Sequence, residues 1–101
     1  MNTDLTGRVA VITGGGAGIG RAGALCLAKC GADIVILDIE TSRCEKVAEE
    51  IKAIGPKALA ITTDVMETAQ IRDAVKQVDK VFGRADILIN NAGGTRYVPF
   101  L

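Results

Sequence analysis

The chain has 101 residues, of which 49% are hydrophobic and 24% are charged, and its 12 basic residues balance its 12 acidic ones. This composition is typical of one globular domain and excludes a disordered chain. Because there is no basic excess, no long apolar run and no signal-peptide pattern, we expect a cytoplasmic protein with no nucleic-acid partner and no membrane segment.

Short apolar runs alternate with amphipathic stretches along the whole chain. Strands are expected over 8–13, 33–38, 57–62 and 86–90. Helices are expected over 18–30, from 41–42 to the Gly-Pro pair at 55–56, and over 68–82. Ser42 and Glu45 fit a capping box for the second helix. With right-handed crossovers, the order βαβαβαβ predicts an α/β fold, a doubly wound parallel sheet of the Rossmann type with strand order 3-2-1-4.

A glycine-rich run, residues 13–20, directly follows the first strand and opens the first helix. Glycine backbone N–H groups and a helix N-terminus favour a bound phosphate, and the run lies at the switch point where such sheets bind ligands. Its spacing does not fit G-x-G-x-x-G, because the third glycine would fall on Ile19 or Arg21. It fits T-G-x-x-x-G-x-G from Thr13 onward. In this the chain resembles the short-chain dehydrogenase/reductase family.

Asp38 ends the second strand, 18 residues after Gly20. A carboxylate there can accept hydrogen bonds from both ribose hydroxyls of an adenosine and would repel a 2′-phosphate, which favours NAD over NADP. Ala17 and Ile39 are apolar where NADP-binding relatives often place a basic residue. Arg43 is the nearest cation, and we expect it to be exposed in the first turn of the second helix. The alternative for Asp38 is a solvated carboxylate at a strand end.

Two further motifs match the resembled family. The family places the pair Asp64-Val65 against the adenine, although Asp64 could instead start the turn into the third helix. The segment Asn90-Asn91-Ala92-Gly93 is implied to stabilise the sheet and to line the cofactor's ribose, although by itself it would be a plausible loop. The predicted cofactor-binding residues are therefore Gly14, Gly15, Ala17, Gly18, Ile19, Asp38, Ile39, Asp64, Val65, Asn91, Ala92 and Gly93.

The family's catalytic residues find no counterpart in this sequence. The family uses a Tyr as general acid/base, a Lys four residues later and a Ser, but Leu101 stands four residues after Tyr97, the only tyrosine. Ser42 is the only serine and is assigned to the helix cap. We therefore expect a single, incomplete dinucleotide-binding domain over residues 1–101, inactive alone.

Three functions remain open from the sequence. The first is the cofactor-binding part of an NAD(P)-dependent oxidoreductase, homo-oligomeric when complete, that interconverts a secondary alcohol and a ketone. The second is a non-catalytic dinucleotide-binding module or sensor, for which 101 residues is the full length. The last is an interaction protein with a vestigial site. The substrate cannot be chosen from the sequence, since the fold supports many.

The three cysteines, Cys26, Cys30 and Cys44, are expected to be reduced thiols in the core. Their odd number argues against a disulfide framework, and the chain contains no histidine. We therefore expect no metal site. The fourth strand is expected to form a sheet edge, which would leave the isolated chain marginally stable or prone to aggregate.

Overall fold

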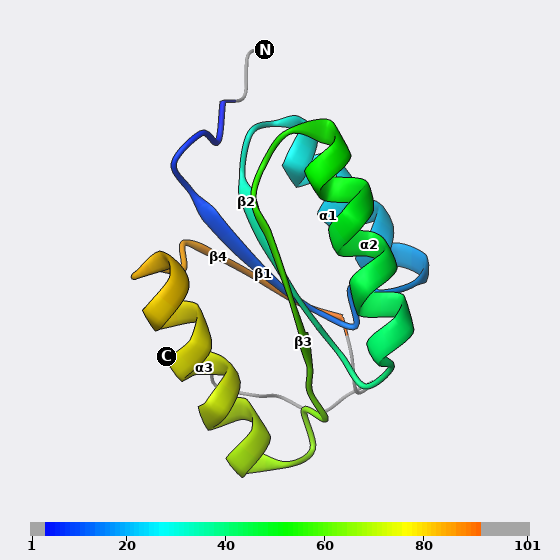
Figure 1. Ribbon diagram of the computed structural model, residues 1–101, viewed down its shortest axis with the longest axis vertical. Coiled ribbons are helices and arrows are strands. Elements are labelled where there is room, and N and C mark those ends of the chain that lie inside the picture. The colour runs from blue at the N-terminus through cyan, green and yellow to red at the C-terminus, as the bar shows by residue number, and fades with distance from the viewer. Residues whose placement is uncertain (1–3, 92–101) are drawn as a thin grey trace.

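The structure, a computed structural model, describes residues 4–91. Strands and helices alternate along the chain (Figure 1) as β1 (Val9–Thr13), α1 (Gly18–Lys29), β2 (Asp33–Asp38), α2 (Thr41–Ile54), β3 (Ala58–Thr62), α3 (Thr68–Phe82) and β4 (Ile87–Asn90). The predicted order is confirmed, and three of the strands begin one residue later than expected. Among the described residues, no helix is long and apolar enough to cross a membrane.

The four strands form one parallel sheet in the order β3-β2-β1-β4, which confirms the predicted topology. Ile12 of β1 pairs with Ile36 of β2 on one side and with Ile89 of β4 on the other. Helices α1 and α2 lie together against one face of the sheet, and α3 lies against the opposite face (Figure 1). The carboxyl ends of all four strands therefore meet at one edge of the molecule.

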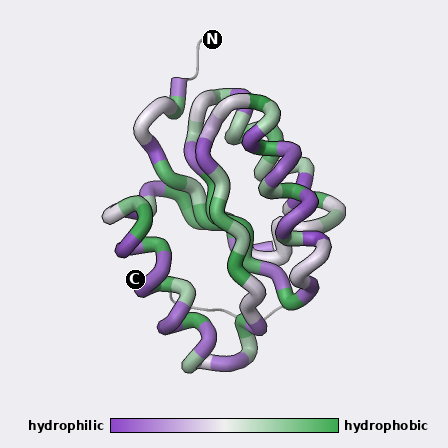
Figure 2. Tube along the Cα trace, viewed as in Figure 1, coloured by the Kyte–Doolittle hydropathy of each residue, from purple (hydrophilic) through white to green (hydrophobic). Residues whose placement is uncertain are grey.

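Each face of the sheet carries its own apolar core. Alternate strand residues point to opposite faces, so Ile12 and Ile36 pack with α1 and α2 while Val11 and Val35 pack with α3. Every residue of β1 is buried, which explains why its sequence is apolar without alternation. Figure 2 shows the consequence, with hydrophobic strands at the centre and hydrophilic positions recurring along the helices.

The helix ends match the sequence only in part. Gly31 follows α1 with φ +99° and Gly83 ends α3 in the left-handed conformation, as glycines at these positions commonly do. The capping box of Ser42 and Glu45 is wrong. Helix α2 begins at Thr41 after an extended Glu40 that makes no side-chain cap, so Ser42 already lies inside the first turn.

The cysteines are free, and only one of them is a core residue. Cys44 is buried, and its thiol lies 3.6 Å from the Asp38 carbonyl oxygen and 3.8 Å from that of Ile61. The expectation of core thiols was wrong for Cys26, which is exposed on α1, and holds only in part for Cys30, which is half-buried.

Strand β4 is anchored at its start by the residue that precedes it, Asp86. Asp86, just before the strand, accepts a hydrogen bond from the Val9 N–H at 2.8 Å, and its own N–H donates to the Val9 carbonyl at 2.8 Å. The guanidinium of Arg84 lies 2.7 Å from the Asp86 carboxylate, and that of Arg8 lies 3.6 Å away. Further along, Leu88 is 41% exposed on the α3 side, so this edge of the described sheet is incompletely covered.

Candidate functional site

A cleft of about 310 Å³ opens at the carboxyl ends of β1, β2 and β3. Ligands bind at this position in open α/β sheets, because the loops that follow the strands diverge there. The described residues that line the cleft are Gly14, Ala17, Leu37, Asp38, Ile39, Arg43, Thr63, Asp64, Val65 and Met66.

The glycine turn passes directly over the end of β2. Its first residue, Gly14, has φ +65° and donates its N–H to the Leu37 carbonyl at 2.6 Å. A Cβ at Gly16 would lie 2.6 Å from the Asp38 Oδ2 atom and 2.7 Å from the Cβ of Arg43. A side chain at this position would therefore displace the groups at the base of the cleft.

The N-terminus of α1 continues the same turn. Ala17 is the N-cap residue in an extended conformation, no side chain caps the helix, and its first turn holds no acidic residue. Gly18 has φ +56°, and Ile19 is 82% exposed. Within residues 4–91 no side chain caps the first N–H groups of the helix, and the helix dipole favours an anion there.

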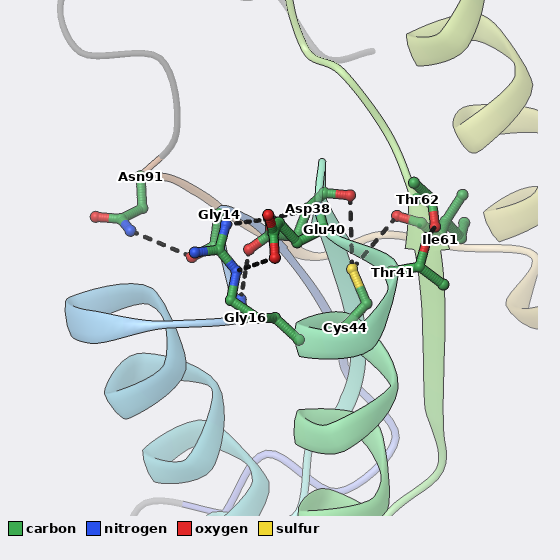
Figure 3. A network of polar contacts seen from close by, with 10 residues as sticks. Gly14, Gly16, Asp38, Glu40, Thr41, Cys44, Ile61, Thr62 and Asn91 are labelled. Atoms are coloured by element: carbon green, nitrogen blue, oxygen red, sulfur yellow. Dashed lines mark hydrogen bonds and ion pairs between the residues drawn. The ribbon is translucent and has the colours of Figure 1, made fainter.

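Asp38 is the charged centre of the cleft (Figure 3). Its Oδ2 accepts a hydrogen bond from the Gly16 N–H at 3.0 Å, and its Oδ1 accepts from the Glu40 N–H at 3.0 Å and from Arg43 Nη2 at 2.9 Å. Burial alone would raise the pKa of this carboxyl, whose side chain is only 4% exposed, but the three donors together hold its pKa below the usual value. Asp38 is therefore ionised at neutral pH and is not the solvated carboxylate of the alternative interpretation.

Arg43 is exposed in the first turn of α2, as expected, but it is also part of the site, which was not expected. Its side chain is 44% exposed, but the guanidinium folds back onto Asp38 and also lies 4.0 Å from the Glu40 carboxylate. The signal was present in the sequence, since a residue in the first turn of α2 is close enough to the end of β2 for a long side chain to return. Leu37, Thr63 and Met66 also line the cleft and were not predicted.

The Asp64-Val65 pair forms the opposite wall of the cleft. Asp64 Oδ1 accepts a hydrogen bond from the Met66 N–H at 2.9 Å, so this residue does start the turn into α3. It nevertheless lines the cleft together with the buried Val65 and the half-exposed Met66. The structural role and the proposed binding role of Asp64 are therefore compatible.

Asn91 joins the end of β4 to the glycine turn. Its N–H donates to the Thr13 hydroxyl at 2.9 Å, and its amide Nδ2 donates to the Gly14 carbonyl at 3.4 Å (Figure 3). The Thr13 hydroxyl in turn donates to Asn90 Oδ1 at 2.9 Å. These contacts connect β1 and β4 at their carboxyl ends, which is the stabilising role that the resemblance implied for the segment.

The structure brings half of the predicted residues into one cleft. Those that line it are Gly14, Ala17, Asp38, Ile39, Asp64 and Val65. Gly18, Ile19 and Asn91 adjoin it without lining it, whereas Gly15 faces the core, where a Cβ would lie 3.0 Å from Ile36. Residues 92 and 93 of the prediction lie outside the described residues. Over residues 4–91, no group of three or more His, Cys, Asp or Glu side chains could hold a metal ion.

Known proteins resemble this chain in both sequence and fold. The model of the short chain dehydrogenase family matches residues 8–101. The cyclohexanol dehydrogenase of Rhodococcus sp. (strain TK6) is 41% identical over 92% of this chain, which spans only 39% of that enzyme. The short-chain dehydrogenase/reductase homolog YusS of Bacillus subtilis (strain 168) is 38% identical over 91% of this chain, which spans 85% of YusS.

Solved structures agree with these relatives. The L-sorbose reductase of Gluconobacter frateurii, complexed with NADPH and L-sorbose, superposes with a TM-score of 0.88 at 39% identity. That match covers 92% of this chain and 36% of the reductase. The NAD⁺-bound xylitol dehydrogenase superposes with a TM-score of 0.86 at 36% identity, over 88% of this chain and 34% of that enzyme. Proteins of this fold therefore include complexes with either dinucleotide.

Proposed function

The chain belongs to the short-chain dehydrogenase family, and we propose that its cleft binds the adenosine half of NAD in preference to NADP. The observation that carries this proposal is the ionised Asp38 at the base of the cleft, held by the glycine turn on one side and the start of α2 on the other. A carboxylate accepts hydrogen bonds from a ribose diol and repels a 2′-phosphate.

The remaining walls fit the rest of the nucleotide. Apolar surface for an adenine ring is supplied by the exposed Ile39, the buried Val65 and the half-exposed Met66. Asp64 also lines the cleft, and its second carboxylate oxygen can accept a hydrogen bond from the amino group of the adenine. The uncapped N-terminus of α1 and the glycine turn before it suit the pyrophosphate. The missing Cβ atoms at Gly16 and Gly20 let the turn, Asp38 and the strand ends approach one another closely.

In the wider reaction, this chain is the cofactor-binding part of an oxidoreductase that acts on a secondary alcohol or ketone. A bound dinucleotide supplies the nicotinamide that exchanges hydride with such a substrate. The chain's own residues bind and orient its adenosine end, and we assign a catalytic role to none of them. We propose further that the complete protein is cytoplasmic and homo-oligomeric and that this chain alone is inactive.

One observation favours a second candidate, a non-catalytic dinucleotide-binding module. This chain spans 85% of the length of YusS, so a family member of closely similar length exists. Both candidates, the cofactor-binding part of an enzyme and the non-catalytic module, predict that this chain alone has no catalytic activity. A module binds NAD but does not reduce it in the presence of secondary alcohols, as followed by absorbance at 340 nm, and measurable reduction would contradict the proposed inactivity of this chain.

Isothermal titration calorimetry of NAD and NADP tests the proposed site. The native chain should bind NAD more tightly than NADP. Because a hydrogen bond to a charged group contributes about 1.5–3 kcal/mol, Asp38→Ala should weaken NAD binding by about 10- to 100-fold. Asp38→Asn keeps the shape of the side chain, and far-UV circular dichroism checks that both variants fold. Asp73→Ala, which removes an exposed carboxylate from α3, is the control.

Two results would refute the assignment. The first is a native chain that prefers NADP. The second is an Asp38→Ala chain that remains folded and binds NAD as tightly as the native chain does.

A further inference from the structure

We propose that Arg43 is a latch on Asp38: its guanidinium occupies the carboxylate in the free chain and must move away before a ribose diol can bind there. The same guanidinium is the only cationic partner for a 2′-phosphate among the described cleft residues. This inference rests on the proposed function and assigns Arg43 as a residue that sets the selectivity between the two dinucleotides. It follows from the accessibility of Asp38 and from the kinds of donor that surround it.

Most hydrogen-bond acceptor positions of the Asp38 carboxylate are occupied in the free chain. A carboxylate offers about four acceptor positions on its two oxygens. Gly16 donates to Oδ2, while Glu40 and Arg43 both donate to Oδ1, so that three of these positions are occupied. The side chain is also only 4% exposed. Two ribose hydroxyls therefore need one donor to leave.

Arg43 is the donor that can leave. The N–H groups of Gly16 and Glu40 belong to the backbone of the glycine turn and of the residue that begins α2, and both are fixed by the fold. Arg43 reaches Asp38 Oδ1 at 2.9 Å through a long flexible side chain that is 44% exposed. Rotation of this side chain into solvent exposes Oδ1 without moving the backbone.

The guanidinium that blocks the diol also suits a 2′-phosphate. Arg43 is the only basic residue among the described residues that line the cleft. Guanidinium groups bind phosphate with two parallel hydrogen bonds, and the position 2.9 Å from Asp38 Oδ1 lies where the ribose hydroxyls are proposed to bind. Arg43 therefore weakens the binding of NAD, strengthens that of NADP, and narrows the preference that Asp38 would impose alone.

A matched pair of ligands isolates this effect. 5′-AMP and adenosine 2′,5′-bisphosphate differ only in the 2′-phosphate, and calorimetry of the full chain gives both affinities. Arg43→Met removes the charge and the donors and keeps an unbranched side chain that favours a helix. Lys46→Met makes the same change at an exposed position of the same helix and is the control.

The latch predicts opposite shifts for the two ligands. Arg43→Met should bind 5′-AMP about 3- to 10-fold more tightly, since the ribose diol no longer competes with a charge-assisted hydrogen bond from an exposed side chain. It should bind the bisphosphate less tightly, so that the ratio of the two affinities changes by at least about tenfold. Lys46→Met should leave this ratio unchanged.

Different results would overturn different proposals. If Arg43→Met binds 5′-AMP no more tightly than the native chain, whereas Asp38→Ala loses that binding, the latch is refuted and the proposed function stands. If Arg43→Met binds 5′-AMP less tightly than the native chain, the latch is also refuted, and Arg43 is a residue that positions Asp38. An equal shift in Lys46→Met would reduce the effect to general charge and also refute the latch. If the native chain binds neither 5′-AMP nor NAD, the proposed function fails, and the latch fails with it.

Discussion

Replacing Gly20 with alanine should destabilise the chain, because the glycine turn leaves no space for a side chain there. Gly20 lies in the first turn of α1 and is buried. Its Cβ would be placed 2.2 Å from the Gly14 carbonyl oxygen and 2.8 Å from Asn91 Nδ2. The first of these obstacles is backbone, which cannot rotate out of the way as the end of a flexible side chain can.

The size of the effect follows from these distances. Ordinary contact begins at 3.4 Å, so the Gly14 carbonyl and α1 must separate by about 1.2 Å. Gly14 is tied to Leu37 by a 2.6 Å hydrogen bond, so this movement would disturb the junction of β1 and β2. Overpacking of this kind costs about 1–3 kcal/mol, whereas alanine in a helix gains about 1 kcal/mol over glycine. Because the obstacle is backbone, we take the upper end of the overpacking cost, about 3 kcal/mol. The net loss in the free energy of unfolding is then about 2 kcal/mol, which corresponds to a Tm lower by about 10 °C.

Gly23 supplies the matched control within the same helix. A Cβ there would meet only the Ile89 Cδ1 atom at 3.8 Å, an ordinary contact. Gly23→Ala should therefore gain about 0.5–1 kcal/mol from helix propensity alone. Urea unfolding followed by far-UV circular dichroism measures both variants against the native chain. If Gly20→Ala is as stable as Gly23→Ala, the close approach of the turn and α1 is wrong.

Three further predictions concern Asp86, Cys44 and Leu88. The Arg84 guanidinium and the Val9 N–H lower the pKa of Asp86 to about 2, so its contribution to stability should be present above about pH 4 and lost as the pH falls toward 2. Asp86→Asn should therefore lower the urea midpoint at pH 7 more than at pH 2, and equal losses would contradict this. Burial raises the pKa of the Cys44 thiol to about 11, whereas Cys26 is exposed. In variants that each retain a single cysteine, a disulfide reagent at pH 8 should therefore modify Cys26 quickly and Cys44 only on unfolding. Equal rates of modification would disprove the protection of Cys44. Leu88→Lys should reduce self-association in sedimentation velocity by charging the exposed edge strand β4, and unchanged association would exclude this edge as its cause.

The fold could be predicted because each local signal agrees with the next one. Apolar runs without alternation indicated strands covered on both faces, and glycines ended the helices between them. Right-handed crossovers, together with a switch point between β1 and β4 at the glycine-rich run, then predicted the observed order of the strands. What failed was the capping of α2. Ser42 and Glu45 have the right spacing for a capping box, but spacing does not fix which residue starts the helix, and the first helical hydrogen bond already runs from Cys44 to Glu40.

The site could be predicted by position but not by contact. Asp38 ends a strand beside the glycine turn, and this alone places its carboxylate at the edge where ligands bind. Its burial could not be derived from the sequence, because that depends on how closely Gly16 passes over it. The exposure of Arg43 was predicted, but its contact with Asp38 was not: the first turn of α2 brings the side chain within reach, whereas helical periodicity does not give the direction in which a long side chain folds.

The contacts of Asp38 in the free chain have a consequence for selectivity. A carboxylate that is 4% exposed would be costly to bury without partners, and the fold supplies three donors that make it stable before any nucleotide arrives. Binding therefore replaces one of these donors, Arg43, by a ribose hydroxyl, and that exchange contributes only the difference between the two hydrogen bonds. The affinity for NAD then depends on the group that must be exchanged, Arg43, as well as on Asp38 itself. Selectivity in this site should accordingly respond to a change in Arg43 even when Asp38 is left intact.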